Sequence, residues 1–207
     1  MLYRIIRTIA YICAKLFFRF KAFGLENIPE DKSIIIAINH SSYIDPFIGA
    51  IAIKKKINFI AKEELFRNPI MGFFIKKLNV LSVKHDQPDI KAFKKALNLL
   101  RKREILMIFP EGTRSFNGEL LEPKMGIGLI AYHSKVPVIP AYIKGANKIL
   151  PRGSKIIRFK KCSIFYGKSV NLTEYYNSDK NKNIYKAISI EIMKEIRKLE
   201  DISNKVK

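Results

Sequence analysis

The sequence has few of the residues that build redox or metal sites. Its two cysteines, Cys13 and Cys162, lie far apart and form no C-x-x-C pair. They suggest neither a disulfide framework nor a thiolate metal site, and they fit a reducing compartment. The three histidines, His40, His85 and His133, include no pair at the spacing of metal ligands. We therefore expect no metal ion and no cofactor.

Acidic residues are also scarce. The 207-residue chain has 18 Asp and Glu against 39 Lys and Arg, which gives a formal net charge of +21. Such an excess favours polyanionic partners, namely nucleic acid, an anionic bilayer or phosphorylated ligands. Part of it is background, because Lys, Ile and Asn are abundant throughout the chain. The basic residues are dispersed, so charge alone does not select nucleic acid, and we expect no nucleic-acid partner.

No apolar run is long enough to cross a membrane, which takes roughly 18 or more largely uncharged residues. Residues 1–23 also lack the continuous apolar centre and the small-residue cleavage site of a signal peptide. At 100° per residue they predict an amphipathic helix with apolar residues on one face and only basic residues on the other. The apolar face contains Leu2, Ile5, Ile6, Ile9, Ile12, Cys13, Leu16, Phe17 and Phe20, and the basic face contains Arg4, Arg7, Lys15 and Arg19.

The single sign of charge on this polar face indicates a helix that lies in the interface of an anionic membrane. The alternative is a helix that packs on the core and exposes a solvated basic face. We expect the protein to be membrane-associated, peripheral or monotopic, at the cytoplasmic face.

The rest of the chain, with 48% hydrophobic residues overall, can build one sizeable core. Apolar segments typical of buried strands alternate with polar turns and amphipathic helices. We predict an α/β fold in which residues 24–207 form a single domain, with a mixed, mostly parallel sheet flanked by helices. Strands are expected at 34–38, 57–61, 79–83, 156–159 and 163–166 and from residue 105, helices at 47–53, 68–77, 89–102, 126–133 and 184–199, and a loop at 175–183.

A polar turn, Asn-His-Ser-Ser-Tyr-Ile-Asp-Pro, follows the predicted strand 34–38. It places Asp45 five positions after His40, close enough to bond one ring nitrogen and fix the tautomer. The other ring nitrogen could then accept a proton. Pro46 suits the first position of a helix with Asp45 as its N-cap, so a turn histidine beside a helix cap is the alternative.

A second polar turn, Phe-Pro-Glu-Gly-Thr-Arg-Ser at 109–115, follows the strand that begins at residue 105. Gly112 allows close backbone approach, the Thr113 hydroxyl can donate, and Arg114 can bind two oxygens at once. These features suit a phosphate, although a surface salt bridge is the alternative role for Arg114. Because a carboxylate would repel a phosphate, we expect Glu111 to brace Arg114 or the turn.

These two turns, together with Val-Pro-Val-Ile-Pro at 136–140, resemble the motifs of the glycerolipid acyltransferase family. The resemblance covers residues 24–172, with its H-x-x-x-x-D motif at His40 and Asp45. It implies transfer of an acyl chain from acyl-CoA or acyl-carrier protein to the sn-2 hydroxyl of lysophosphatidate, which makes phosphatidate for phospholipid synthesis. The co-substrate is then the acyl thioester, and the acceptor is a lysophospholipid.

The resemblance also implies which residues form the site. Glu111, Gly112, Thr113 and Arg114 would bind substrate, and two lysines would extend that site. Family members often carry a lysine at the position of Lys62, and they usually carry an arginine where this chain has Lys84. A lysine there keeps the charge but loses the planar bidentate geometry.

No nucleophile for a covalent acyl-enzyme is evident, because the chain has no G-x-S-x-G elbow and no paired cysteine. Direct transfer is the simpler chemistry, with His40 as general base and Asp45 as the group that orients it. The alternatives are transfer to glycerol-3-phosphate or another lysophospholipid, or a non-catalytic protein that binds membranes or nucleic acid. The segment Gly-Ile-Gly-Leu-Ile-Ala at 126–131 mimics a dinucleotide motif, but no strand precedes it, so we interpret it as close helix packing.

Overall fold

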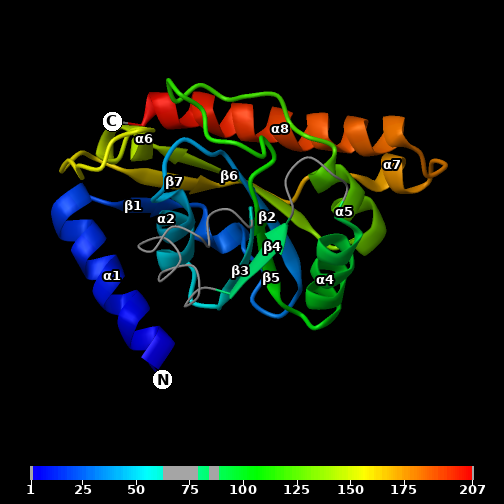
Figure 1. The fold of residues 1–207 in the computed structure, drawn as a ribbon, viewed down its shortest axis with the longest axis horizontal. Coiled ribbons are helices and arrows are strands. Elements are labelled where there is room, and N and C mark those ends of the chain that lie inside the picture. The colour runs from blue at the N-terminus through cyan, green and yellow to red at the C-terminus, as the bar shows by residue number, and fades with distance from the viewer. Residues whose placement is uncertain (1, 63–78, 84–88, 207) are drawn as a thin grey trace.

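Seven strands form one sheet in the part of the chain that the computed structural model describes, residues 2–62, 79–83 and 89–206. The strand order is β1-β7-β6-β2-β5-β3-β4, and every neighbouring pair is parallel except the antiparallel pair β6 and β7. Helices cover both faces of the sheet (Figure 1). The predicted fold class, a single α/β domain with a mixed, mostly parallel sheet, is confirmed.

The strands are β1 (Lys21–Phe23), β2 (Ile34–Ile38), β3 (Ile57–Lys62), β4 (Asn79–Val83), β5 (Ile105–Ile108), β6 (Val138–Lys144) and β7 (Ser163–Tyr166). The helices are α1 (Leu2–Phe18), α2 (Asp45–Ile51), α4 (Ile90–Arg101), α5 (Gly126–Ser134), α6 (Ala146–Ile149), α7 (Thr173–Tyr176) and α8 (Lys182–Lys205), and a 3-10 turn, η1, covers Leu25–Asn27. The predicted helix at 68–77 lies outside the described residues.

The central strand β2 is apolar along its whole length because both of its faces are covered. All five of its residues are fully buried. Alternate side chains point to opposite faces, so Ile34, Ile36 and Ile38 join the core layer under α1, α2 and α6, whereas Ile35 and Ala37 join the layer under α4, α5 and α8. A strand buried on both sides reads as a continuous apolar run.

The N-terminal helix ends earlier than the sequence indicated. α1 stops at Phe18, and Arg19 takes a left-handed conformation with a φ of 46°. The turn that follows buries the Phe20 side chain, which makes an edge-to-face contact with Tyr11. Residues 21–23 then pair with β7 as the edge strand β1. The expected helix over 1–23 is therefore wrong after Phe18, because burial of Phe20 and strand pairing replace the last helical turn.

The face of α1 that packs on the protein contains Ala10, Tyr11 and Ala14, and the helix exposes its apolar face. Ala14 is buried, and the guanidinium of Arg7 donates to the carbonyl of Ile51 at the C-terminal end of α2, 3.1 Å away. A cation is favoured at a helix C-terminus, so Arg7 does not lie on a solvated basic face as the sequence indicated. The large apolar side chains are about half exposed or more, namely Ile5, Ile6, Ile9, Ile12, Leu16 and Phe17.

Among the described residues, no helix is both long enough and apolar enough to cross a membrane.

Two other predictions differ from the structure. Residues 156–159 form no strand, since their apolar side chains point to solvent and their chain follows the turn after α6. The segment expected as a loop at 175–183 contains the end of α7 and the beginning of α8, whose N-cap Asn181 accepts from the amide of Ile184. The strand at 79–83 and the helix that contains residues 126–133 are confirmed.

Candidate active site

The two polar turns meet because they follow neighbouring parallel strands. β2 and β5 end at the same edge of the sheet, the edge at which open α/β sheets bind ligands. Two hydrogen bonds join the turns directly. The amide of His40 donates to Glu111 Oε1 at 2.7 Å, and the amide of Ser115 donates to the carbonyl of His40 at 2.8 Å.

The predicted pair of His40 and Asp45 is formed. Nδ1 of His40 lies 2.9 Å from Oδ2 of Asp45, and that oxygen also accepts from the amides of Ser41 at 2.6 Å and Ser42 at 2.7 Å. A carboxylate that accepts from Nδ1 fixes the proton there and leaves Nε2 free to accept one. Asp45 is fully buried at the beginning of α2, and the N-cap of that helix is Ile44, so the expected N-cap role of Asp45 is wrong.

Phe109 holds the imidazole from the other turn. Its ring stacks on the His40 ring with a centroid separation of 4.0 Å and an interplanar angle of 24°. Phe109 comes directly after β5, so the second turn supplies an apolar wall as well as polar groups. The imidazole is therefore held by a carboxylate at one nitrogen and by an aromatic ring at one face.

Glu111 braces the two turns from inside the protein. Its side chain is buried, and its second oxygen, Oε2, accepts from the amide of Leu121 at 3.0 Å. Burial raises the pKa of Glu111 to about 7, against the lowering effect of the hydrogen bonds from His40 and Leu121. Of the two partners expected for this carboxylate, Arg114 or the turn, it is the turn that it holds.

Arg114 lies beside the histidine turn and has unused hydrogen-bonding capacity. Its guanidinium lies over the ring of Tyr43, with 3.4 Å from Cζ to the ring centroid. Its Nη1 atom is buried and has no hydrogen-bond partner among the described residues. Burial, and to a smaller extent the charge of Arg152, lowers the pKa of Arg114. A buried guanidinium nitrogen without a partner suits a site that an anionic ligand completes.

Arg152 is a second cation at this site, and it belongs to no motif that the sequence analysis identified. It donates from Nη1 to the carbonyl of Arg114, and its guanidinium lies 3.6 Å from the ring centroid of Phe116. Both arginines are thus stacked on aromatic rings, a geometry that lysine does not reproduce. The charge of Arg152 is close enough to act on Arg114, which costs free energy, and an anion bound by both would offset that cost.

The structure describes the other predicted substrate-binding residues only in part. Gly112 has a φ of 65°, a left-handed conformation that favours glycine, and a Cβ there would also displace the flexible side chain of Lys124. Thr113 is half-buried in the same turn. Lys62 ends β3 at the same edge of the sheet, and its side chain, like the whole of Lys84, lies outside the described part of the chain.

A mostly parallel α/β sheet thus presents a histidine, a carboxylate and a basic turn at one edge, as an enzyme that transfers an acyl group could use them. The family model described as Acyltransferase matches residues 19–144, more than half of the chain. The protein belongs to this acyltransferase family.

Three relatives define the resemblance further. The 1-acyl-sn-glycerol-3-phosphate acyltransferase of Bacillus subtilis is 31% identical over 156 residues, which are 75% of each chain. The chloroplastic 1-acyl-sn-glycerol-3-phosphate acyltransferase LPAT1 of Arabidopsis thaliana is 33% identical over 142 residues, 67% of this chain but 40% of the plant protein. The crystal structure of the 1-acyl-sn-glycerophosphate (LPA) acyltransferase PlsC from Thermotoga maritima matches with a TM-score of 0.73 and 27% identity, over 94% of this chain and 78% of that one. The predicted resemblance to lysophosphatidate acyltransferases is confirmed.

Proposed function

We propose that this enzyme transfers an acyl chain from acyl-CoA or acyl-carrier protein to the sn-2 hydroxyl of 1-acyl-glycerol-3-phosphate, so that phosphatidate and a free thiol are formed. The observation that carries the proposal is the His40–Asp45 hydrogen bond beside the turn in which Arg152 binds the carbonyl of Arg114. A general base and a phosphate-binding pair of arginines are the two parts that this reaction needs from the protein.

In the proposed reaction, Nε2 of His40 takes the proton of the acceptor hydroxyl while the hydroxyl oxygen attacks the thioester carbonyl. A carbon–oxygen bond forms, the carbon–sulfur bond of the tetrahedral intermediate then breaks, and the leaving thiolate takes the proton back from the imidazolium. Asp45 stabilises the imidazolium through Nδ1. General-base assistance of this kind is worth about 10²–10⁴-fold in rate, so positioning must supply much of the remainder.

Arg114 and Arg152 position the acceptor through its phosphate in this proposal. The unpaired Nη1 of Arg114 supports the assignment, as does the stacking of both guanidinium planes on Tyr43 and Phe116. Stacked planes are held in orientation before the ligand arrives, which lowers the entropy cost of binding. Glu111 acts one step away, since it holds the backbone of His40 rather than the substrate.

The acceptor is a lipid, and α1 provides the membrane contact in this proposal. Its apolar face is exposed although its opposite face packs on α2, which favours a helix in the bilayer interface over a core helix. α2 begins at Asp45 and ends at Ile51, where Arg7 of α1 binds it, so one short helix connects the proposed membrane contact with the site. Two free cysteines, Cys13 and Cys162, fit a reducing compartment, so we place the enzyme at the cytoplasmic face.

A matrix of acyl donors and acceptors on the purified protein tests this function by release of free thiol. Lysophosphatidate should be used better than glycerol-3-phosphate or an uncharged lysolipid, and a His40→Ala variant supplies the background. A preference for glycerol-3-phosphate or another lysophospholipid would change the acceptor but keep the chemistry. Thiol release that equals the His40→Ala background with every pair would overturn the proposal in favour of a non-catalytic membrane-binding protein.

A further inference from the structure

The loop between α6 and β7 exposes more apolar side-chain surface than a solvated loop needs. Residues 155–161 read Lys-Ile-Ile-Arg-Phe-Lys-Lys. Ile156 is 72% exposed, Ile157 53% and Phe159 71%. Scattered single apolar residues on a surface are normal, but three in one short segment mark an interaction site.

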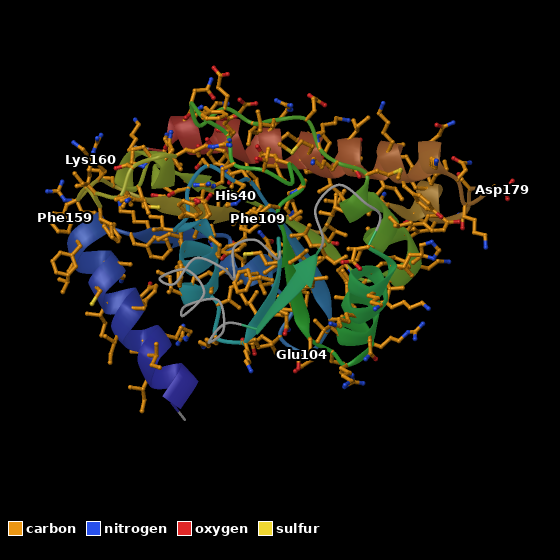
Figure 2. All side chains as sticks on the ribbon, in the orientation of Figure 1. His40, Glu104, Phe109, Phe159, Lys160 and Asp179 are labelled. Atoms are coloured by element: carbon orange, nitrogen blue, oxygen red, sulfur yellow. The ribbon has the colours of Figure 1, made fainter. Side chains whose placement is uncertain are left out.

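This loop is joined to the end of α1. The rings of Phe17 and Phe159 are stacked with a centroid separation of 5.3 Å, and the amide of Cys162 donates to the carbonyl of Phe18 at 3.0 Å. Figure 2 shows Phe159 and Lys160 beside the C-terminal end of α1, at the end of the molecule opposite Asp179. The exposed apolar surface of α1 therefore continues onto the loop.

The two segments that form this junction carry charge of one sign. No Asp or Glu occurs in residues 1–25 or 123–173, which contain both segments. An open surface pocket of about 490 Å³ lies at the junction, and three cations line it, namely Arg19, Lys160 and Lys161. Its remaining lining is apolar, from Leu16, Phe17 and Phe159. Arg19 is held there in the left-handed conformation that helices usually leave to glycine at this position.

We propose that residues 155–161 and the end of α1 form a second membrane contact, and that the phosphate of an anionic lipid binds among Arg19, Lys160 and Lys161. This contact rests on the membrane association of the proposed function but lies apart from the acyl-transfer site. The apolar side chains of the loop enter the bilayer beside α1, while the three cations stay at the depth of the lipid phosphates.

The mixture of side chains selects a lipid over other anions. A free phosphate would pair with the cations but would leave Ile156 and Phe159 exposed. An anionic bilayer would pair with the cations and also bury these apolar side chains. Alternation of basic and apolar residues is the pattern of segments that lie at a charged membrane surface. A second copy of the chain would bury the apolar residues but would bring like charges together.

The charge part is tested with a triple variant, Arg19→Gln with Lys160→Gln and Lys161→Gln. Its control is Lys180→Gln with Lys182→Gln and Lys186→Gln, an equal change of charge at exposed positions near the far end of the molecule. Vesicles of phosphatidylcholine with and without phosphatidylglycerol serve as probes in co-sedimentation. We expect the triple variant to bind the anionic vesicles about a hundredfold more weakly at low salt and the control much less so. Equal losses of vesicle affinity in the two variants would show that only the net charge of the protein matters, and would overturn the proposed lipid site.

The apolar part is tested with Ile156→Ser, Ile157→Ser and Phe159→Ser together. The control is Ile190→Ser with Ile202→Ser, at exposed positions on α8. The loop variant should bind both kinds of vesicle more weakly, with unchanged thermal stability, and the control should bind like the parent. A loop variant that binds like the parent would overturn the proposal, as would one that loses a dimer in solution without losing vesicle binding.

Turnover on a short-chain acceptor soluble in water separates this contact from the chemistry. We expect all four variants to keep the parental rate without vesicles, because none of the changed residues lies at His40 or Arg114. If the parent itself showed no turnover, the proposed function would fail while the vesicle comparison still decided the membrane contact.

Discussion

At the scale of single residues, Asp45 has two tasks that one atom performs. Its Oδ2 accepts from the ring of His40 and from the amides of Ser41 and Ser42. The carboxylate therefore shapes the turn and orients the imidazole together. Removal of the side chain would leave buried amides without partners, which costs about 1–3 kcal/mol for each unsatisfied group.

Asparagine separates the two tasks, because its carbonyl oxygen can accept the same amide bonds but carries no charge. We predict that Asp45→Asn keeps the stability of the parent within about 1 kcal/mol and lowers kcat clearly, whereas His40→Ala removes about 10²–10⁴-fold of the rate. Denaturant unfolding and thiol release on the same preparations measure both effects. Near-parental turnover of His40→Ala would end the general-base assignment.

Arg114 recognises the acceptor rather than the donor in the proposed function. Arg114→Lys keeps the charge but loses the planar group that stacks on Tyr43. We predict that the KM for the phosphorylated acceptor rises by about tenfold or more, a loss of about 1.4 kcal/mol, while the KM for the thioester changes little. Arg152→Lys should act in the same direction. Steady-state kinetics with each substrate varied in turn decide this, and equal rises in both KM values would remove Arg114 from the phosphate site.

Glu111 should make the stability of the protein depend on pH. Its pKa is raised from an ordinary 4.5 to about 7 by burial. Because the fold favours the neutral form, this contribution is fully present below about pH 4.5 and is lost as the pH rises through about 7. The difference of pKa corresponds to about 3 kcal/mol.

Glu111→Gln is neutral at every pH and keeps one acceptor for the amides of His40 and Leu121. We predict that it is less stable than the parent near pH 4.5, by about 1–3 kcal/mol for the amide left unpaired, and that the difference shrinks as the pH approaches 8. Denaturant unfolding of both proteins across this range provides the measurement. A difference that stays constant with pH would show that the fold does not raise the pKa of Glu111.

Much of the site follows from local sequence, and the rest depends on contacts between distant segments. The spacing of His40 and Asp45 predicted their hydrogen bond, because five residues after a strand suffice to return the carboxylate. Arg152 lies 38 residues from Arg114 in the sequence and carries no motif, so only the tertiary structure brings the two together. The partner of Glu111 was left between Arg114 and the turn for the same reason.

Among the strands and helices, a strand buried on both faces could be predicted from the sequence, whereas the edge strand β1 could not. β2 reads as an unbroken apolar run because helices cover both of its faces. β1 has three residues and exists only through its pairing with β7. The periodicity of the local sequence therefore predicted that the N-terminal helix continues through these residues. Residues 156–159 have the composition of a strand. Their apolar side chains nevertheless face solvent, and the segment does not pair with the sheet.

The packing of α5 on α8 tests the interpretation of residues 126–131 as a close helix contact. A Cβ on Gly128 would lie 1.9 Å from the backbone oxygen of Tyr185, whereas one on Gly126 would meet nothing within 4 Å. We predict that Gly128→Ala destabilises the protein by about 1–3 kcal/mol or more, because backbone atoms must move apart. Gly126→Ala should be neutral or stabilising by up to about 1 kcal/mol. Thermal unfolding of the pair measures the contrast, and equal effects would contradict the close approach.

At the scale of the whole molecule, the charge and the exposed apolar surface are distributed unevenly. The first 25 residues and residues 123–173 contain no acidic residue, whereas α8 carries Glu191, Glu195 and Glu200. The acid-free segments include α1 and the loop that contacts it. The surface formed by α1 and this loop thus combines exposed apolar side chains with positive charge, which is the combination that an anionic bilayer attracts.

The apolar face of α1 can be tested apart from its charge. Ile5, Ile9 and Leu16 are about half exposed or more, so replacing all three by Ser should change the free energy of unfolding by little, within about 0.5 kcal/mol at each site. In lipid each would lose about 1 kcal/mol of apolar transfer free energy, given the part of each side chain that is free to enter the bilayer. We therefore predict a loss of about a hundredfold in binding to neutral and anionic vesicles alike, with little dependence on salt.

Turnover on a water-soluble acceptor should stay at the parental level in this variant, because the chemistry lies at His40 and Arg114. Ala14→Leu serves as the contrasting change, since Ala14 is buried against the protein, where a larger side chain should lower the stability instead. Co-sedimentation with vesicles, thermal unfolding and the soluble-substrate assay on both proteins distinguish the two faces. If the triple serine variant bound vesicles like the parent yet unfolded more easily, the apolar face of α1 would belong to the core and the membrane contact would have to lie elsewhere.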